Sequence, residues 1–154
     1  MQATPTRTAP IAPAANWHGA ALALRVDDDR FLGLLAAYRT SGGLATGHEI
    51  AARRPRTGLS ELARAIAARE VIGMEWGGQR WLPFFQFERG DVAVRAPVRL
   101  LVGELAGLLE DGDLAQWFVQ PNGWLDGAQP LHLLDSDFAR VHDAARALRF
   151  ACSN

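Results

Sequence analysis

The sequence predicts a mainly α protein of 154 residues that carries one short β-hairpin. Apolar residues recur at helical spacing over most of the chain, which predicts amphipathic helices. One stretch changes to strand-like alternation around a Gly-Gly pair, which predicts the hairpin. The composition, with 49% hydrophobic and 21% charged residues, is typical of a globular chain with a buried core.

We expect three regions along the chain. Residues 1–20 are rich in Thr, Pro and Ala and lack periodicity, so they bury too little to offset the entropy of ordering, and we predict a flexible tail. Residues 21–90 have the helix, helix and hairpin order of a helix-turn-helix with a β-wing. Residues 91–154 form a second region that is entirely helical.

The first helix is predicted to begin at three consecutive acids, Asp27, Asp28 and Asp29. Negative charge there complements the unpaired N–H groups of a helix N-terminus. The sequence Ser41-Gly42-Gly43 is predicted to end this helix.

Thr46 and Glu49 have the spacing of a capping box, which predicts a short second helix. Pro55 stops that helix, and a third helix is predicted from about Ser60 to Glu70. The intervening connector, Arg53 to Gly58, is longer than the turn of a standard helix-turn-helix.

Residues 71–83 alternate in hydrophobicity on both sides of Gly77-Gly78, and two adjacent glycines suit a two-residue hairpin turn. Three phenylalanines follow within residues 83–87. Their rings need cover, and we expect it at the junction between the two halves of the chain.

Four helical segments are predicted in the back half. The clearest runs from Pro97 through Leu109. A second is capped by Asp113 and stops at Pro121, a short third begins at Pro130, and Asp135 or Ser136 caps the last.

The formal net charge of −1 indicates neither a nucleic acid nor a membrane as partner. Residues 1–90 hold 11 Arg against 8 acids, whereas residues 91–154 hold 5 Arg against 9 acids. The front half is therefore mildly basic and the back half acidic.

The expected location is the cytoplasm. A single cysteine, Cys152, suits a reducing compartment. The chain has no apolar run of about 18 residues that would span a membrane, and its start has no signal-peptide pattern. We expect no membrane partner, and we expect a homo-oligomer.

The sequence shows no arrangement typical of an enzyme. The four histidines have no metal-ligand spacing, and no Ser or Cys lies in a nucleophile elbow. We therefore expect a protein that is not an enzyme and that needs no metal or cofactor.

Basic residues gather in and after the second predicted helix. Five arginines minus three glutamates give this segment a local charge of +2, enough for some phosphate contact. A solvated basic face on a helical scaffold is the alternative, because the third helix is mostly Ala and offers few base-reading side chains. The candidate DNA-binding residues are Arg53, Arg54, Arg56, Arg64 and Arg69.

Two places in the back half suit contact with another protein. Trp124 lies between two turns, where an aromatic side chain serves either as an interface anchor or as packing. The last helix ends in basic and aromatic residues, which either stabilise the helix terminus or probe a partner's pocket. The candidate partner-binding residues are Trp124, Arg146, Arg149, Phe150 and Asn154.

A specific pattern accompanies these residues: Trp117-Phe118, Pro121-Asn122, Leu125-x-Gly127 and Pro130-Leu131. It resembles the toxin-binding domain of the Xre/MbcA/ParS antitoxin family, and the resemblance covers roughly residues 96–150. The segment Trp81–Phe87 also resembles the stretch that leads into this domain in longer family members.

The resemblance implies the antitoxin of a type II toxin–antitoxin system. Such proteins neutralise a RES-domain toxin, which degrades NAD or transfers ADP-ribose, by binding over its active site, often with the antitoxin's C-terminal end. Many also bind operator DNA through an N-terminal helix-turn-helix and so regulate their own operon. The alternative function is a DNA-binding transcriptional regulator without a toxin partner.

Overall fold

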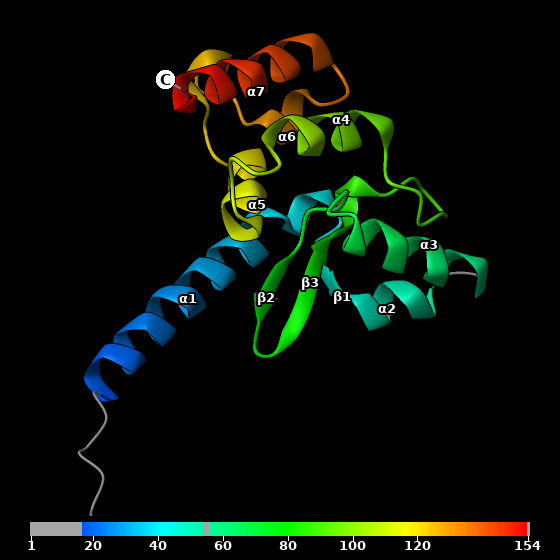
Figure 1. Ribbon diagram of the computed structural model, residues 1–154, viewed down its shortest axis with the longest axis vertical. Helices are drawn as coiled ribbons and strands as arrows, with labels where there is room; N and C mark the ends of the chain where they lie inside the picture. The colour runs from blue at the N-terminus through cyan, green and yellow to red at the C-terminus, as the bar shows by residue number, and fades with distance from the viewer. Residues whose placement is uncertain (1–16, 54–55, 154) are drawn as a thin grey trace, which may run out of the picture.

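The computed structural model describes residues 17–53 and 56–153, and the side chains within residues 27–53 and 58–153. It confirms a mainly helical fold with a small β element (Figure 1). The front half contains α1 (Trp17–Ala37), η1 (Arg39–Ser41), β1 (Leu44–Thr46), α2 (Gly47–Ala52), α3 (Arg56–Ala67), β2 (Met74–Trp76), β3 (Gln79–Pro83) and η2 (Phe84–Gln86). The back half contains α4 (Ala96–Leu105), α5 (Asp111–Val119), η3 (Gly123–Leu125), α6 (Pro130–Leu133) and α7 (Phe138–Cys152).

The front half has the element order of a helix-turn-helix followed by a hairpin wing. α2 ends at Ala52 and α3 begins at Arg56, so the connector is shorter than expected. The prediction that residues 53–58 lengthen this turn is therefore wrong, because Arg56 to Leu59 already belong to the helix.

The three strands form an antiparallel sheet in the order β1-β3-β2. The predicted hairpin is confirmed: Gly77 (φ 59°) and Gly78 (φ 72°) turn the chain between β2 and β3 in the left-handed conformation that glycine tolerates. β1 pairs with the other edge of β3, with Thr46 opposite Trp81. The sequence did not predict β1, because a strand of three residues is too short to show alternation.

The predicted capping box at the start of α2 is confirmed. The Glu49 backbone N–H donates to Thr46 Oγ1 at 3.3 Å, and the Thr46 backbone N–H donates to Glu49 Oε2 at 2.8 Å. Hydrogen bonds from the Thr46 backbone and hydroxyl stabilise the carboxylate and lower the pKa of Glu49.

α1 begins earlier than predicted. It starts at Trp17, so the acids Asp27–Asp29 lie inside the helix and not at its N-terminus. Ala and Leu dominate the preceding residues and favour helix, which explains the extension. Residues 17–20 of the predicted tail are therefore helical, whereas residues 1–16 lie outside the described part. Asp28 instead accepts a hydrogen bond from Trp76 Nε1 at 2.8 Å, which joins α1 to β2.

Helix boundaries in the back half also differ from the predictions. α4 ends at Leu105, short of the predicted Leu109, because Ala106 is extended and Gly107 has a φ of 80°. α5 begins at Asp111, so Asp113 lies within its first turn and does not cap it. Asp113 instead forms an ion pair with Arg30 of α1 at 2.5 Å.

The last two helices show one confirmed start and one wrong cap. α6 begins at Pro130, as predicted. The N-cap position of α7 is Asp137, and its side chain makes no capping hydrogen bond. Neither Asp135 nor Ser136 therefore caps the helix, and Asp135 pairs instead with Arg95.

The aromatic connector lies at the junction of the two halves, which confirms that prediction. Phe85 stacks on Tyr38, which directly follows α1, with ring centroids 5.6 Å apart, and the Phe118 ring of α5 lies 5.3 Å from it. Tyr38 is fully buried, and its hydroxyl donates to the Ala115 carbonyl of α5 at 2.6 Å. Both halves therefore contribute to one hydrophobic cluster.

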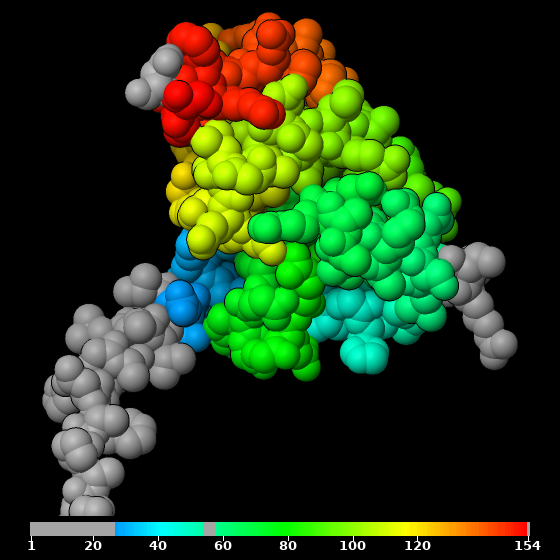
Figure 2. Space-filling model, in the orientation of Figure 1, coloured from blue at the N-terminus to red at the C-terminus, as the bar shows by residue number. Residues whose placement is uncertain are grey.

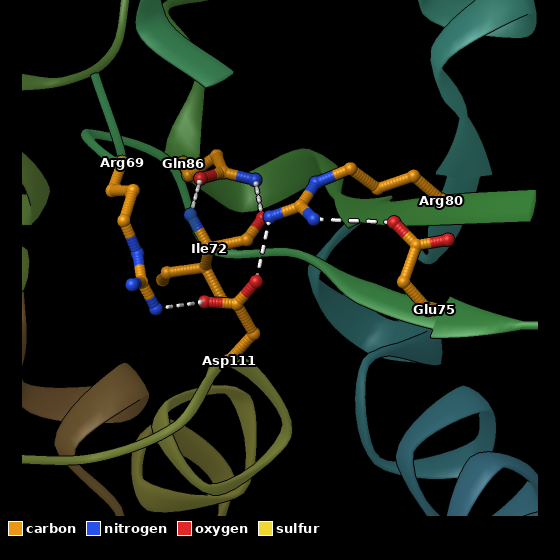
Figure 3. A network of polar contacts seen from close by, with 6 residues as sticks. All are labelled: Arg69, Ile72, Glu75, Arg80, Gln86 and Asp111. Carbon is orange, nitrogen blue, oxygen red and sulfur yellow. Dashed lines mark hydrogen bonds and ion pairs between the residues drawn. The ribbon is translucent and has the colours of Figure 1, made fainter. Parts of the chain in front are cut away.

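A buried amide supports the same junction (Figure 3). The Gln86 side chain accepts from the Ile72 backbone N–H at 2.7 Å and donates to the Ile72 carbonyl at 2.8 Å. It also donates to the Pro83 carbonyl at 2.9 Å. The loop before β2 and the end of β3 are therefore fixed to each other by a single side chain.

Burial of Tyr38 predicts a loss of stability at alkaline pH. Burial raises the pKa of the Tyr38 phenol, so its contribution is complete below the unfolded pKa of about 10 and is lost as the pH rises above it. Tyr38 is the only tyrosine, so phenolate absorbance should appear only as the circular dichroism signal of the helices disappears.

The Tyr38→Phe variant is the control for this prediction. It should lose about 1–3 kcal/mol of unfolding free energy at neutral pH, because the buried Ala115 carbonyl loses its partner. Its stability should then depend much less on alkaline pH. Phenolate absorbance at pH near 10 in a chain that stays folded would contradict the assignment.

Candidate functional site

α7 lies at the outer side of the back half, with its C-terminal end at the edge of the molecule (Figure 1). Its buried face consists of Val141, Ala144 and Ala145. It packs on α4 and on η3. Small residues on this face let α7 approach α4 closely, so the helix is held firmly while its last turn points outward.

Glu104 of α4 holds the end of α7. Its carboxylate lies 3.5 Å from Arg149 Nη1 and 3.7 Å from His142 Nε2. The same Arg149 nitrogen donates to the Glu104 carbonyl oxygen at 3.3 Å. The charge of Arg149 is therefore partly offset within the chain, and its side chain is oriented by α4.

An open hollow of about 500 Å³ lies between the ends of α4 and α7. Three of the predicted partner-binding residues line it together: Arg146, Arg149 and Phe150. Phe150 is 72% exposed, which is unusual for a large aromatic side chain. Asn154, which was also predicted to bind the partner, lies outside the described residues.

Trp124 is exposed elsewhere on the back half. It belongs to η3, where its side chain is 52% exposed, and it does not line the hollow at the end of α7. The Asn122 side chain accepts from the Trp124 backbone N–H at 3.0 Å, and Leu125 next to it is buried. The turn that follows has positive φ angles at Asp126 (56°) and Gly127 (83°).

The motif behind the family resemblance builds this turn. Asn122 is one of two buried polar residues in the described part of the chain, and its backbone and side chain together hold residues 122–128 in a closed loop. Trp117 and Phe118, in the preceding helix α5, pack edge to face at 5.1 Å. These positions therefore act structurally, and Trp124 is the side chain they present.

Three of the predicted DNA-binding arginines have described side chains, and each of the three contacts another side chain of the protein. Arg64 pairs with Glu70 at 3.6 Å, and Arg69 pairs with Asp111 of α5 at 3.4 Å. The guanidinium of Arg53 lies over the Phe84 ring at 5.1 Å, on the η2 side of α2. Arg54 and the side chain of Arg56 lie outside the described residues.

The surface beside α3 is apolar. A groove of about 520 Å³ lies between α2, α3 and the hairpin, and Leu59, Leu62 and Ile66 contribute to its lining. An apolar lining does not compensate a phosphate group for the water that it loses on binding. A DNA contact through α3 would therefore rest on few side chains.

Sequence reasoning missed a different cationic region around Phe84. Arg53, Arg89 and Arg95 line two hollows there, although they are far apart in the sequence. No local motif connects these residues, because only the packing of α2, η2 and the start of α4 brings them together.

The described part of the chain holds no group of three His, Cys, Asp or Glu side chains arranged to bind a metal ion. None of its helices combines the length and apolar character needed to cross a membrane. Comparisons of the sequence with family models and with curated proteins, and of the structure with solved structures, find no match.

Loss of the Asn122 side chain should loosen the turn that presents Trp124. We expect Asn122→Ala to lower the unfolding free energy by about 1 kcal/mol, because the Trp124 N–H loses its acceptor. Asn122→Asp keeps an acceptor oxygen and should retain most of that stability. Urea unfolding of the three proteins measures this, and equal losses in both variants would contradict the capping role.

Proposed function

We propose that this chain is the antitoxin of a type II toxin–antitoxin system. It neutralises a RES-domain toxin, which degrades NAD or transfers ADP-ribose, by binding over the toxin's active site. The observation that carries the proposal is the exposed Phe150 at the end of α7, flanked by Arg146 and Arg149. The resemblance of residues 96–150 to the Xre/MbcA/ParS toxin-binding domain supports the same assignment.

The geometry of α7 suits insertion into another protein's cavity. An aromatic side chain that projects from a rigid helix can fill a pocket at little conformational cost. The contacts of Glu104 with His142 and Arg149 hold the last turns in place before binding. Less ordering is then required when the complex forms.

Charge favours the same kind of partner. A cleft that binds the phosphates of NAD must be cationic, and residues 91–154 carry 9 acids against 5 Arg. Complementary charge speeds the encounter and disfavours wrong partners. Trp124, at a separate position of the back half, supplies a second apolar contact.

Truncation of Phe150 should weaken toxin binding strongly. An interface anchor contributes about 2 kcal/mol or more, so we expect Phe150→Ala to raise the Kd by about 30-fold or more. Calorimetry with the purified product of the neighbouring open reading frame would measure the Kd. Co-expression of the two would report relief of toxicity, which the variant should reduce.

Leu32→Ala is the matched control, because Leu32 is an exposed apolar residue of α1 that is 56% accessible. It should leave both readouts unchanged. No complex between the wild-type chain and the toxin, together with no relief of growth inhibition, would reject the proposal.

A second function is favoured by one observation, the helix-turn-helix and wing order of α2, α3, β2 and β3. In this alternative the chain is a transcriptional regulator that binds operator DNA without a toxin partner. The ion pairs of Arg64 and Arg69 and the apolar groove beside α3 reduce its support.

The regulator function predicts salt-dependent binding to the DNA upstream of the gene. Replacing Arg53, Arg54 and Arg56 by Ala should weaken a mobility shift, because each lost phosphate contact lowers the affinity and its dependence on salt. Exposed Arg140→Ala is the control, since Arg140 belongs to α7. Unchanged binding by the triple variant would argue against the regulator.

A further inference from the structure

Two adjoining hollows form one groove where η1, η2 and α6 meet. Their volumes are about 760 Å³ and 280 Å³, and they lie side by side, because four residues line both of them. The shared residues are Phe84, Phe87, Glu88 and Arg89.

Arginines that form no close ion pair line this groove, and one of them, Arg53, acts on the chain at longer range: in addition to the hydrogen bonds from Thr46, its charge lowers the pKa of Glu49. Within the described part of the chain, four arginines form no ion pair with a carboxylate: Arg39, Arg53, Arg89 and Arg146. Arg53 and Arg89 line the groove, and Arg39 directly precedes the lining residue Thr40. Arg146 alone lies elsewhere, on α7.

The wall of the groove is a fixed structure. The Phe84 backbone N–H donates to the Gly43 carbonyl at 3.0 Å, which joins η2 to the end of η1. A Cβ at Gly42 would lie 3.0 Å from the Phe84 Cβ, and Gly42 has a φ of 102°. Only glycine suits this close approach. The Phe84 ring is consequently held half-exposed, with the Arg53 guanidinium over it.

Hydrogen-bonding groups complete the lining. Thr40, Ser41 and His132 lie on the side of the larger hollow. Arg95 also lies there, paired with Asp135, and donates to the Phe85 carbonyl at 3.3 Å. The charge of Asp135 is thus offset by Arg95. Glu88 is the one remaining lining carboxylate among the described residues.

We propose that this groove binds a single-stranded segment of nucleic acid. Cationic side chains that follow a groove, together with an aromatic face for a base, are the combination that single strands require. Arg53 and Arg89 would contact phosphates, and a base would stack beside the Arg53 guanidinium that lies over the Phe84 ring. A duplex is a poorer fit, because sequence-reading proteins insert a protruding helix or ribbon into it, whereas this surface is concave.

The proposal is independent of the antitoxin function, since the groove shares no residue with the hollow at the end of α7. DNA and RNA strands offer the same phosphates and bases and differ in the 2′-hydroxyl. DNA and RNA oligonucleotides of the same sequence therefore test which of the two kinds of strand binds in the groove.

The test is fluorescence anisotropy of short labelled DNA and RNA oligonucleotides with the full chain, over a series of salt concentrations. We expect binding of at least one of them, with affinity that falls as salt rises. The double variant Arg53→Ala/Arg89→Ala should bind more weakly. The slope of log affinity against log salt should also decrease by about 1.4, which is the loss of two phosphate contacts on a single strand.

The control is the double variant Arg99→Ala/Arg140→Ala, which removes the same charge from exposed positions outside the groove. It should keep the wild-type slope, and circular dichroism would verify that both variants fold. Equal loss in the two variants, or no binding of either oligonucleotide, would overturn the proposal. So would equal competition by polyglutamate, which would assign the groove to acidic proteins.

Discussion

The burial of the segment between β3 and α4 is the constraint on which the rest of the structure depends. Phe85 is packed between Tyr38, just after α1, and Phe118 of α5, and the next residue, Gln86, satisfies the backbone of Ile72. A buried amide that satisfies both polar groups of a distant residue tolerates little displacement, since each unsatisfied group costs about 1–3 kcal/mol. The placement of α5, η3 and α7 relative to the front half follows from this packing.

Ion pairs across the same junction explain why basic residues near α3 are poor candidates for a ligand site. Asp111, in the first turn of α5, accepts from Arg69 at 3.4 Å and from Arg80 of β3 at 2.8 Å (Figure 3). Arg30 of α1 is similarly paired with Asp113. Segments of both halves lie side by side where α1, β2 and α5 adjoin (Figure 2), and a hollow of about 390 Å³ opens between them. Arginines in these pairs join the two halves, and a phosphate would have to compete with a carboxylate for each of them.

Local signals in the sequence predicted the local structure well. The capping box at Thr46, the glycine turn at Gly77 and Pro130 at the start of α6 each involve neighbouring residues, so spacing alone was informative. β1 was missed because its three residues become a strand only by pairing with β3. Asp113 was assigned as a cap because the sequence does not show that Arg30 lies beside it.

For the candidate site, too, the sequence predicted contacts between neighbouring residues and not those between distant ones. Arg146, Arg149 and Phe150 lie within two turns of one helix, so their proximity could be predicted, whereas the clamp by Glu104 of α4 could not. Arg53 and Arg89 were not associated, because their proximity depends on η2 and on the close approach of Gly42 to Phe84.

The two surfaces also differ in the kind of partner that their shapes admit. The exposed ring of Phe150 at the end of α7 gains free energy when another molecule provides a cavity around it, as a toxin cleft would. A concave cationic groove instead gains free energy when it binds a thin anionic chain, because counterions are then released from that chain. The groove lies where η1, η2 and α6 meet and the hollow lies between α4 and α7, and the two surfaces share no lining residue.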